Sequence, residues 1–454
     1  MWYHFIAIGG SAMHNLALDL LKKGHKVTGS DDEIFEPSYT RLKDANILPE
    51  KFGWYPEKIN ENIDVVIVGM HARPDNPELL KVKELGIKYY SYPEFLYEHS
   101  KNKKRIVIAG SHGKTTTTSI ILHVLKESRM KFDYLVGAQI DGFDRMVSIS
   151  DDAPIMIFEG DEYLTAPFDP RPKFHLYKPH IALITGIAWD HINVFETFDK
   201  YVEQFRIFIE LIEPNGTLVW YEGDNELQKL SKFIRNNIKS IPYNEHKAIT
   251  VNKDTYLLIN DNEKLKINLF GKHNLQNING AKIVCNELGI SDSEFYNAIK
   301  TFRGASKRLQ KIGFNKENNI TFFLDFAHSP SKVKATIEAI KSIYKNEKLI
   351  ACLELHTYSS LQKDFLKQYS NTMDLADVSL IYFNPKTLEL KKKPILNESD
   401  IIDGFNNSDI KVFTDSKQLF SYLKTSIYKN SVVLLMSSGN FDNFNINEWI
   451  KSFN

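Results

Sequence analysis

The segment with the clearest chemical potential is residues 108–119, which read IAGSHGKTTTTS. A Walker A loop has four residues between its first glycine and its Gly-Lys pair. Here only two residues separate Gly110 from Gly113, so the loop is a shortened form of that pattern. An apolar run, RIVIAG, precedes the loop, and a helical pattern follows it. A loop in that position directs backbone N–H groups and the positive end of a helix dipole toward an anion.

Two side chains at the end of this loop extend the interpretation. Lys114 would place a positive charge beside the outer phosphates of a nucleotide, and the Thr115 hydroxyl would bind Mg²⁺. The alternative is a plain glycine turn with an exposed lysine. We predict that the loop binds the phosphates of ATP through Gly110, Ser111, His112, Gly113, Lys114, Thr115 and Thr116.

Acidic residues at the ends of two further apolar runs are candidate metal ligands. Glu159 directly follows the apolar part of APIMIFEGDEY, and a carboxylate at the end of a neighbouring strand supplies the oxygen that Mg²⁺ prefers. Asp161 and Glu162 are better explained as a surface acidic cluster. Asp190 and His191 close a similar run, HIALITGIAWDH. His191 could be a second Mg²⁺ ligand, but a structural histidine is equally compatible with its position.

Two later segments could contribute to a nucleotide site. FGKHNLQN carries His273, Asn274 and Asn277. Asparagine can read an adenine edge and histidine can stack on it, although Asn274 could equally cap a helix. Arg308, in SKRLQ, could reach the γ-phosphate as an arginine supplied by a neighbouring domain does. A surface arginine is the alternative.

These candidates follow the strands of a repeated α/β pattern. We predict a Rossmann-like unit over residues 1–101, a central ATP-binding unit over 102–303 and a third, Rossmann-like unit over 304–454 that closes on ATP. Ligands of open α/β sheets lie outside the C-terminal strand ends, which is where the candidates fall. The KNKKR run at 101–105 is expected to be a solvated linker, and the polar stretch 385–409 a surface excursion.

Local signals place several elements. AMHNLALDLLKKG has helical spacing, and Gly24 should end that helix. A second helix should run from about Thr115 to Arg129. TYLLINDNEKLKINLFG is typical of a hairpin that turns at residues 260–262. Ser329 is a good N-cap for a helix that begins at the following proline.

Composition restricts the class of protein. Lys plus Arg and Asp plus Glu each number 57, so the formal charge is zero, and the basic excess typical of nucleic-acid binding is missing. The two cysteines have neither a disulfide-framework nor a metal-site spacing. No signal-peptide pattern opens the sequence, and no run approaches the ~18 apolar residues of a membrane span. We expect a soluble, cytoplasmic protein that is a monomer or a weak homodimer.

Taken together, these motifs resemble those of the Mur ligases, the ATP-dependent amino-acid ligases of peptidoglycan assembly. AGSHGKTTT is similar to the shortened phosphate loop of that family, with Ser111 in place of its threonine. Five further features occur in the order and spacing of the family over nearly the whole chain: Glu159, the Asp190-His191 pair, GKHNLQN, KRLQ and LDFAHSP. The resemblance implies a three-domain ligase that uses ATP and Mg²⁺ to form a C–N bond.

The N-terminal segment most resembles the branch of the family that uses UDP-N-acetylmuramate. IGGSAM and TGSD are similar to the Gly-rich start and second strand end of that branch. The resemblance implies that the UDP-sugar is bound by Gly9, Gly10, Ser11, Met13, Ser30, Asp31 and His71.

The incoming amine has two candidates. EGDEYLTAPFDPRPKFHLYKP resembles the acidic motif of ligases of peptidoglycan recycling, which attach L-alanyl-γ-D-glutamyl-meso-diaminopimelate in one step. The alternative is the biosynthetic ligase that adds free L-alanine. LELHTYSS combines features of both, since Glu354 is like the recycling ligases and His356-x-Tyr358 is like the alanine-adding ones.

By this resemblance, the muramate carboxylate attacks the γ-phosphate of ATP to give an acyl phosphate, and the amine then displaces phosphate. Lys114, Glu159 and His191 would be the catalytic residues, with Thr115, Glu159 and His191 holding Mg²⁺. Asp325, at the end of TFFLD, would contact the nucleotide. Three alternatives are a P-loop ATPase with another acceptor, a folylpolyglutamate-type ligase and a non-catalytic regulator that binds nucleotide sugars.

Overall fold

The computed structural model describes residues 1–190, 194–391, 393–427 and 429–453. The chain divides into two compact units. The first comprises Met1–Ile187, Phe198–Asn244 and Gly280–Ala298, and the second comprises Ala188–Thr197, Glu245–Asn279 and Ile299–Asn454. Each unit contains at least one sheet dominated by parallel strands, which agrees with the predicted α/β class. The predicted domain limits at residues 101 and 303 stay predictions.

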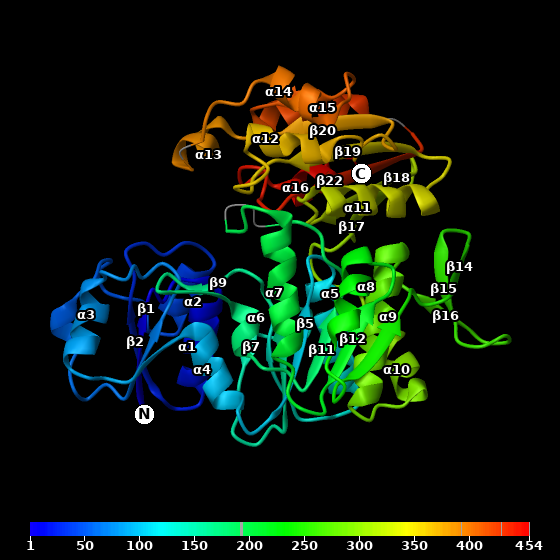
Figure 1. Ribbon diagram of the computed structural model, residues 1–454. Coiled ribbons are helices and arrows are strands. Elements are labelled where there is room, and N and C mark those ends of the chain that lie inside the picture. Colours follow the sequence, from blue (N-terminus) through cyan, green and yellow to red (C-terminus); the bar gives the residue numbers. More distant parts are fainter. Residues whose placement is uncertain (191–193, 392, 428, 454) are drawn as a thin grey trace. The chain divides into compact units, whose positions relative to one another are not determined.

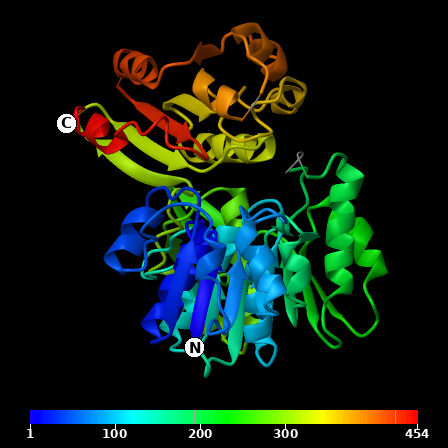
Figure 2. The same cartoon turned by 90° about the vertical axis from the view of Figure 1, so that its left-hand side faces the viewer.

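The N-terminal sheet of the first unit is entirely parallel, in the order β2-β1-β3-β4 (Figure 2, blue). Its strands are β1 (Trp2–Ile6), β2 (Lys26–Ser30), β3 (Val65–Val68) and β4 (Tyr89–Ser91). They alternate with the helices α1 (Ser11–Lys22), α2 (Ser38–Asp44), α3 (Pro77–Glu84) and α4 (Tyr92–Ser100). Every residue of β3 is buried, as expected for a parallel strand covered on both faces. α1 ends before Gly24, as predicted.

The first unit also contains a seven-stranded sheet, in the order β13-β12-β11-β5-β8-β6-β7 (Figure 1). Its strands are β5 (Lys104–Ala109), β6 (Asp133–Leu135), β7 (Val147–Ser148), β8 (Ile155–Glu159), β11 (Ile181–Ile184), β12 (Thr217–Tyr221) and β13 (Lys239–Tyr243). Only β7 runs antiparallel to its neighbour. Because β5 lies between β8 and β11, the segments that follow these three strands meet at one edge of the sheet.

Further elements complete the first unit. A short hairpin of β9 (Leu164–Ala166) and β10 (Asp169–Pro172) follows β8. The helices are α5 (Lys114–Glu127), α6 (Lys173–Leu176), α7 (Phe198–Glu210), α8 (Asn225–Leu230) and α10 (Asp292–Ile299). α5 matches the helix predicted after the phosphate loop. α9 (Lys272–Glu287) contributes residues to both units.

The prediction of a solvated linker at residues 101–105 is wrong. Lys103 and Arg105 are buried. The Arg105 guanidinium donates to five backbone oxygens, those of Ser100, Lys101, Lys103, Tyr177 and Lys178, and pairs with Glu213 at 2.7 Å. Lys103 pairs with the buried carboxylate of Asp133. These cations satisfy buried oxygens where the two sheets of the first unit join, a role that a run of basic residues does not reveal.

The large sheet of the second unit has the order β17-β18-β22-β19-β20-β21. Its strands are β17 (Gln310–Asn315), β18 (Ile320–Asp325), β19 (Lys348–Glu354), β20 (Val378–Tyr382), β21 (Lys411–Phe413) and β22 (Ser431–Met436). Five are parallel, and β17 pairs antiparallel with β18. Alternate residues of β18 enter different cores, with Phe323 in one and Phe322 in the other. The sheet is therefore covered on both faces.

Helices cover this sheet and a smaller sheet accompanies it. The helices are α11 (Pro330–Ile343), α12 (Lys363–Leu366), α13 (Pro385–Leu390), α14 (Glu398–Phe405), α15 (Ser416–Ser426) and α16 (Ile446–Lys451). An antiparallel sheet of β14 (Ala248–Val251), β15 (Asp254–Leu258) and β16 (Lys264–Ile267) contains the predicted hairpin. Ser329 is the N-cap residue of α11, but its side chain makes no capping hydrogen bond. No helix in the described parts of the chain is long and apolar enough to cross a membrane.

The prediction of a surface excursion over residues 385–409 is also wrong. The segment forms α13 and α14, and Leu388, Leu396, Ile401 and Phe405 enter a hydrophobic core of the second unit. The Asn397 side chain forms a capping box with Asp400 at the start of α14. The many lysines and asparagines of this stretch cover short helices whose apolar residues are too sparse to give a visible period.

Candidate functional site

The short loop after β5 has a conformation that its two glycines require. Gly110 has φ +121°, and a Cβ there would lie 2.2 Å from Thr185 Oγ1 and 2.8 Å from the Thr185 nitrogen. Gly113 has φ +75° and is the residue before α5. The Ser111 N–H donates to the Gly186 oxygen at 2.9 Å. The loop is thus packed against the end of β11, and its shortness follows from that close approach.

Lys114 opens α5 and is held by two acceptors. Its Nζ lies 2.5 Å from Glu162 Oε2 and donates to the Gly110 oxygen at 2.7 Å. Burial opposes the charge of Lys114, but the carboxylates of Glu162, Asp161 and Glu159 outweigh it and raise the pKa of the lysine. The lysine therefore stays protonated beside the loop that is predicted to bind phosphates.

The explanation of Glu162 as part of a surface cluster is wrong. Its side chain is 1% exposed and is the ion-pair partner of Lys114. Tyr201, which is fully buried on α7, donates to Glu162 Oε1 at 3.1 Å. The Tyr201 hydroxyl also lies 2.8 Å from Ser111 Oγ. Ser111, Tyr201, Glu162 and Lys114 thus form one network. Nothing in the sequence singled out Tyr201, which occupies an ordinary apolar position of an amphipathic helix.

Glu159 and Thr115 lie side by side at the end of β8 and the start of α5. Thr115 Oγ1 donates to Glu159 Oε1 at 2.8 Å, and the Gly137 N–H donates to Glu159 Oε2 at 2.8 Å. A Cβ at Gly137 would lie 2.7 Å from Glu159 Oε1, so a side chain at Gly137 would displace the carboxylate. A hydroxyl and a carboxylate next to a phosphate loop are the oxygen donors that Mg²⁺ takes in nucleotide sites. His191, the third predicted ligand, lies outside the described residues.

The N-terminal candidates gather where β1 and β2 end. The Gly9 N–H donates to Asp31 Oδ2 at 2.7 Å. Asp31 is 1% exposed, and its other oxygen has no hydrogen-bond partner among the described residues. Burial raises the pKa of Asp31 to about 6, against the lowering effect of the Gly9 N–H. The nearby charge of His71 also lowers it. An orphaned buried carboxylate oxygen beside a glycine loop is suited to a hydroxyl-bearing ligand.

The other N-terminal candidates have different surroundings. The Ser30 hydroxyl donates to the buried carboxylate of Glu78. Ser11 is exposed, Gly10 lies at the N-terminus of α1, and Met13 is buried in the core. The Ser30 and Met13 side chains are therefore buried in the interior around the N-terminal sheet. The residues at the loop between β1 and α1 are Gly9, Gly10, Ser11 and Asp31.

In the second unit, the first turn of α9 carries His273, Asn274 and Asn277. Asn274 Nδ2 donates to the Phe270 oxygen at 2.9 Å, so this side chain ties the start of the helix to the preceding residues. Asn277 Nδ2 lies 3.5 Å from Asn274 Oδ1. Burial lowers the pKa of His273 to about 4, so its ring is neutral near pH 7 and suited to stacking. This contact is not N-terminal capping, because Asn274 lies within α9 and its side chain donates to a carbonyl oxygen, and the predicted contact with adenine stays a prediction.

Asp325 lies at the end of β18, and its carboxylate accepts hydrogen bonds from backbone N–H groups. Its two oxygens accept from the N–H groups of Leu309 and Ala327, each at 2.5 Å. Burial raises the pKa of Asp325 to about 6, although the charge of Arg308 lowers it. The Arg308 guanidinium lies over the Phe326 ring, 4.3 Å from its centroid. Asp325 therefore fixes the turn that carries Arg308.

Asp190, the other predicted residue of the Asp-His pair, forms an ion pair with Lys332 of α11, with 3.4 Å between Oδ2 and Nζ.

A further cluster lies at the carboxyl end of β19. Glu354 is buried and accepts from the Ser437 hydroxyl and from the Phe441 N–H at 3.0 Å. His356 Nδ1 lies 3.8 Å from Glu354 Oε1, and Lys391 donates to the His356 oxygen. Burial lowers the pKa values of both His356 and Lys391. Lys393 lies over the Tyr358 ring, with Nζ 3.1 Å from its centroid. We call Glu354, His356, Lys391 and Lys393 the β19 cluster.

Comparison with known proteins identifies the arrangement. Residues 2–104 match the Mur ligase family, catalytic domain; residues 108–285 match the Mur ligase middle domain; and residues 307–439 match the Mur ligase, glutamate ligase domain. UDP-N-acetylmuramate–L-alanine ligase of Clostridium botulinum, strain Langeland, is 30% identical over 96% of this chain and 94% of that protein. This chain belongs to the Mur ligase family.

Two solved structures share the fold of this Mur ligase. Murein peptide ligase from Psychrobacter arcticus has a TM-score of 0.67 and 23% identity, covering 100% of this chain and 98% of that one. UDP-N-acetylmuramate–alanine ligase from Thermotoga maritima has a TM-score of 0.71 and 19% identity, with the same coverage of both chains. At these identities the likeness establishes the three-domain fold.

Membership of the family fixes the type of chemistry. Mur ligases are ATP-dependent enzymes that form a C–N bond and require Mg²⁺. The residues around the short loop fit both groups. Lys114 and the start of α5 offer positive charge to phosphates, and Thr115 with Glu159 offers oxygens to a divalent cation. Mg²⁺ in nucleotide sites takes its other ligands from phosphate oxygens and water.

Proposed function

We propose that this Mur ligase joins UDP-N-acetylmuramate to L-alanyl-γ-D-glutamyl-meso-diaminopimelate through an acyl phosphate. The observation that carries the choice of amine is the β19 cluster. The tripeptide has three carboxylates, whereas free L-alanine has one. Lys391 and Lys393 lie at one strand end, where they can pair with carboxylates, and the ring of His356, whose pKa burial lowers, can donate a hydrogen bond to another. A buried Glu354 beside them can hold an ammonium group.

The hairpin after β8 gives further support. It contains the PFDPRPKF extension that resembles the recycling ligases. Asp169 and Arg171 form a bidentate pair on β10, with contacts of 2.9 and 2.7 Å. Phe168 packs against a hydrophobic cluster of the N-terminal sheet. The extension is therefore an ordered element of the first unit, and the partly exposed Arg171 guanidinium can meet an acidic substrate.

In the proposed reaction, Lys114 holds the outer phosphates of ATP, and Thr115 and Glu159 hold Mg²⁺. The cation, when bound, neutralises phosphate charge as the carboxylate of the muramate attacks. His191 and the turn at Arg308 are proposed to complete the site, and His273 with Asn274 and Asn277 to bind adenine. The UDP-sugar is assigned to the loop of Gly9, Gly10 and Ser11, with Asp31 accepting from a hydroxyl.

A second candidate function is ligation of free L-alanine. It is favoured by the names of the sequence relatives, such as UDP-N-acetylmuramate–L-alanine ligase from Clostridium acetobutylicum, which is 29% identical over 99% of this chain and 97% of that protein. The His356-x-Tyr358 spacing also resembles the alanine-adding ligases.

The deciding experiment offers the enzyme ATP, Mg²⁺ and UDP-N-acetylmuramate with either the tripeptide or L-alanine, and measures phosphate release. We expect turnover with the tripeptide. Turnover with L-alanine and none with the tripeptide would overturn the proposal in favour of the second candidate. ATP hydrolysis that needs no UDP-sugar would instead indicate an ATPase with another acceptor. Binding of the UDP-sugar without any phosphate release would indicate a regulator.

A further inference from the structure

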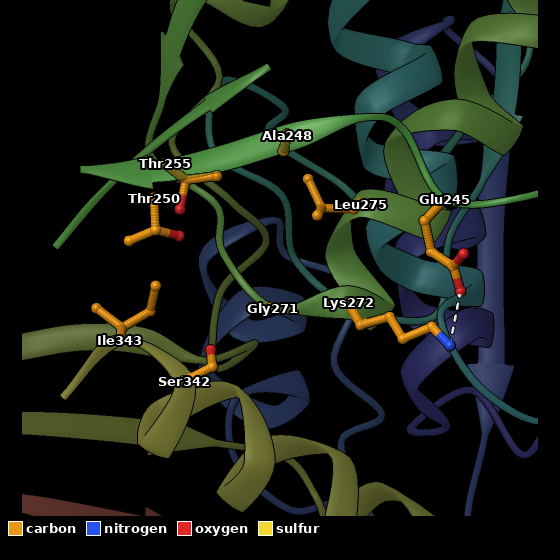
Figure 3. Close-up of a pocket in the computed structure, with 9 residues that line it drawn as sticks. All are labelled: Glu245, Ala248, Thr250, Thr255, Gly271, Lys272, Leu275, Ser342 and Ile343. Atoms are coloured by element: carbon orange, nitrogen blue, oxygen red, sulfur yellow. Dashed lines mark ion pairs between the residues drawn. The ribbon is translucent and has the colours of Figure 1, made fainter. Parts of the chain in front are cut away.

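A cavity of about 230 Å³ lies in the second unit, apart from the residues assigned above (Figure 3). It is an open pocket bordered by the small antiparallel sheet, the start of α9 and the end of α11. Its lining residues are Glu245, Ala248, Thr250, Thr255, Gly271, Lys272, Leu275, Ser342 and Ile343. This volume is below the range of about 300–1,000 Å³ found for drug-sized ligands, so the cavity suits a molecule the size of one amino acid.

The register of the small sheet explains one wall of the cavity. Thr250 of β14 pairs with Thr255 of β15, and Ala248 pairs with Leu257. Side chains of alternate residues share a face of a sheet, so the paired threonines and Ala248 point to the same side. The opposite face carries Lys266, which pairs with Asp254 at the surface.

Thr255 gives this wall an unused polar atom. The residue is 5% exposed, and its Oγ1 is buried without a hydrogen-bond partner among the described residues. Buried hydroxyls are almost always hydrogen-bonded, so an orphaned one at a cavity indicates a missing partner. Figure 3 shows the Thr255 hydroxyl on the side of the sheet that faces Ser342 and Ile343.

The other end of the cavity is charged. Lys272 and Glu245 form an ion pair with 3.3 Å between Nζ and Oε1 (Figure 3). Leu275 and Ala248 lie between this pair and the threonines. The cavity thus has an ion pair at one end, apolar walls in the middle and an unsatisfied hydroxyl at the other end.

We propose that this cavity binds a free α-amino acid with a short hydroxyl or amide side chain. Its ammonium and carboxylate groups would pair with Glu245 and Lys272, so that neither protein charge loses a partner. Its side chain would pass Leu275 and hydrogen-bond to Thr255.

The site is placed to act on nucleotide binding. Lys272 and Leu275 belong to the same first turn of α9 that carries His273 and Asn274. A Cβ at Gly271, just before this turn, would lie 2.5 Å from Ala339 Cβ, so the turn is packed tightly on α11. This inference does not depend on which amine the enzyme ligates.

The test is isothermal titration calorimetry of the full chain without ATP. The probes are L-serine, L-threonine, L-asparagine and L-glutamine, with L-valine as the apolar isostere of L-threonine. We expect saturable binding of at least one polar probe. Thr255→Val keeps the volume and removes the hydroxyl, so affinity should fall about tenfold, as for one lost hydrogen bond. Thr255→Ser should restore it, and Lys272→Met should weaken binding of every probe.

Lys266→Met is the matched control, because it removes a lysine from the opposite face of the same sheet. It should leave binding unchanged. The proposal is overturned if no probe binds, or if Thr255→Val and Lys272→Met bind as the wild type does. Loss of binding in His356→Ala with retention in Thr255→Val would assign the amino acid to the β19 cluster and would equally overturn it.

Discussion

The ammonium of Lys114 lies 2.5 Å from the carboxylate of Glu162, a residue 48 positions further along the chain. The pair sits directly behind the short phosphate loop, and Glu162 is fixed in turn by Tyr201. The lysine is thus held by a carboxylate and by the Gly110 oxygen. In the proposed site, phosphate oxygens of ATP would compete with this carboxylate.

Lys114→Ala should abolish most of the catalysis. Removing one fixed charge that stabilises a transition state commonly lowers the rate by about 10²–10³. We expect phosphate release that depends on the UDP-sugar to fall by that factor. The control is Lys126→Ala, on the same helix, whose Nζ donates to the Gly142 oxygen at the surface. Near-wild-type release in Lys114→Ala would refute the phosphate loop.

Glu162→Gln should change the pH dependence. The carboxylate raises the pKa of Lys114, so its neutralisation should lower that pKa. The lysine then loses its proton at a lower pH, and the alkaline limb of the kcat/KM profile should move to lower pH. Glu162→Asp should restore part of the shift. A loss of activity with an unmoved alkaline limb would mean that Glu162 has only a structural role.

Glu159→Gln should weaken the binding of Mg²⁺ without unfolding the protein. The amide keeps the size of the side chain, but it presents one neutral oxygen in place of a carboxylate beside Thr115. We expect the Mg²⁺ concentration for half-maximal activity to rise by about tenfold or more. Glu210→Gln, at an exposed pair on α7, is the control. An unchanged Mg²⁺ titration would exclude Glu159 from the metal site.

Asp31→Asn should alter the pH dependence of stability. The native pKa of about 6 lies above the ordinary 3.8, so the folded chain holds this proton more tightly than the unfolded chain does. Stability from Asp31 is therefore present at low pH and is lost as the pH rises from about 4 to about 6, by at most about 3 kcal/mol. Asparagine cannot ionise, so the variant should lose less stability over that interval.

The measurement for Asp31 is the thermal unfolding midpoint at pH 4.5 and pH 7, expressed as a difference for each protein. Asp75→Asn provides the control, because that side chain is 77% exposed. Equal differences for the wild type and Asp31→Asn would contradict the raised pKa. The lower pH lies near the start of the affected interval, and the upper pH lies about 1 unit above its end.

Arg105→Met should destabilise the first unit. The change removes the hydrogen bonds that the guanidinium donates to the carbonyl oxygens of Tyr177 and Lys101. Loss of one partner from a buried charged group commonly costs about 3–5 kcal/mol. The neighbouring Lys104→Met removes an exposed charge and should have little effect. Comparable denaturation midpoints for the two variants would show that Arg105 is not a structural cation.

Several features of the enzyme could be predicted because they are local in the chain. The loop of Gly110 and Gly113 lies between a strand and a helix whose own residues specify them, so its place in the fold could be predicted from a few positions. The same holds for α1 and its end before Gly24, and for Glu159 at the end of a buried strand. Short-range backbone preferences and hydrophobic periods carry this information.

Other features exist only because distant segments pack together. The contact of Tyr201 with Ser111 joins residues 90 positions apart, and no sequence pattern within α7 predicts this contact. The burial of Glu162, Lys103 and Arg105 likewise depends on which oxygens surround them after folding, although their charge suggests exposure. The orphaned hydroxyl of Thr255 follows from the way two strands, α9 and α11 border a pocket. Residue type and spacing determined the chemistry of the loop, while the tertiary structure decided which buried groups found partners, because desolvation is a property of the assembled fold.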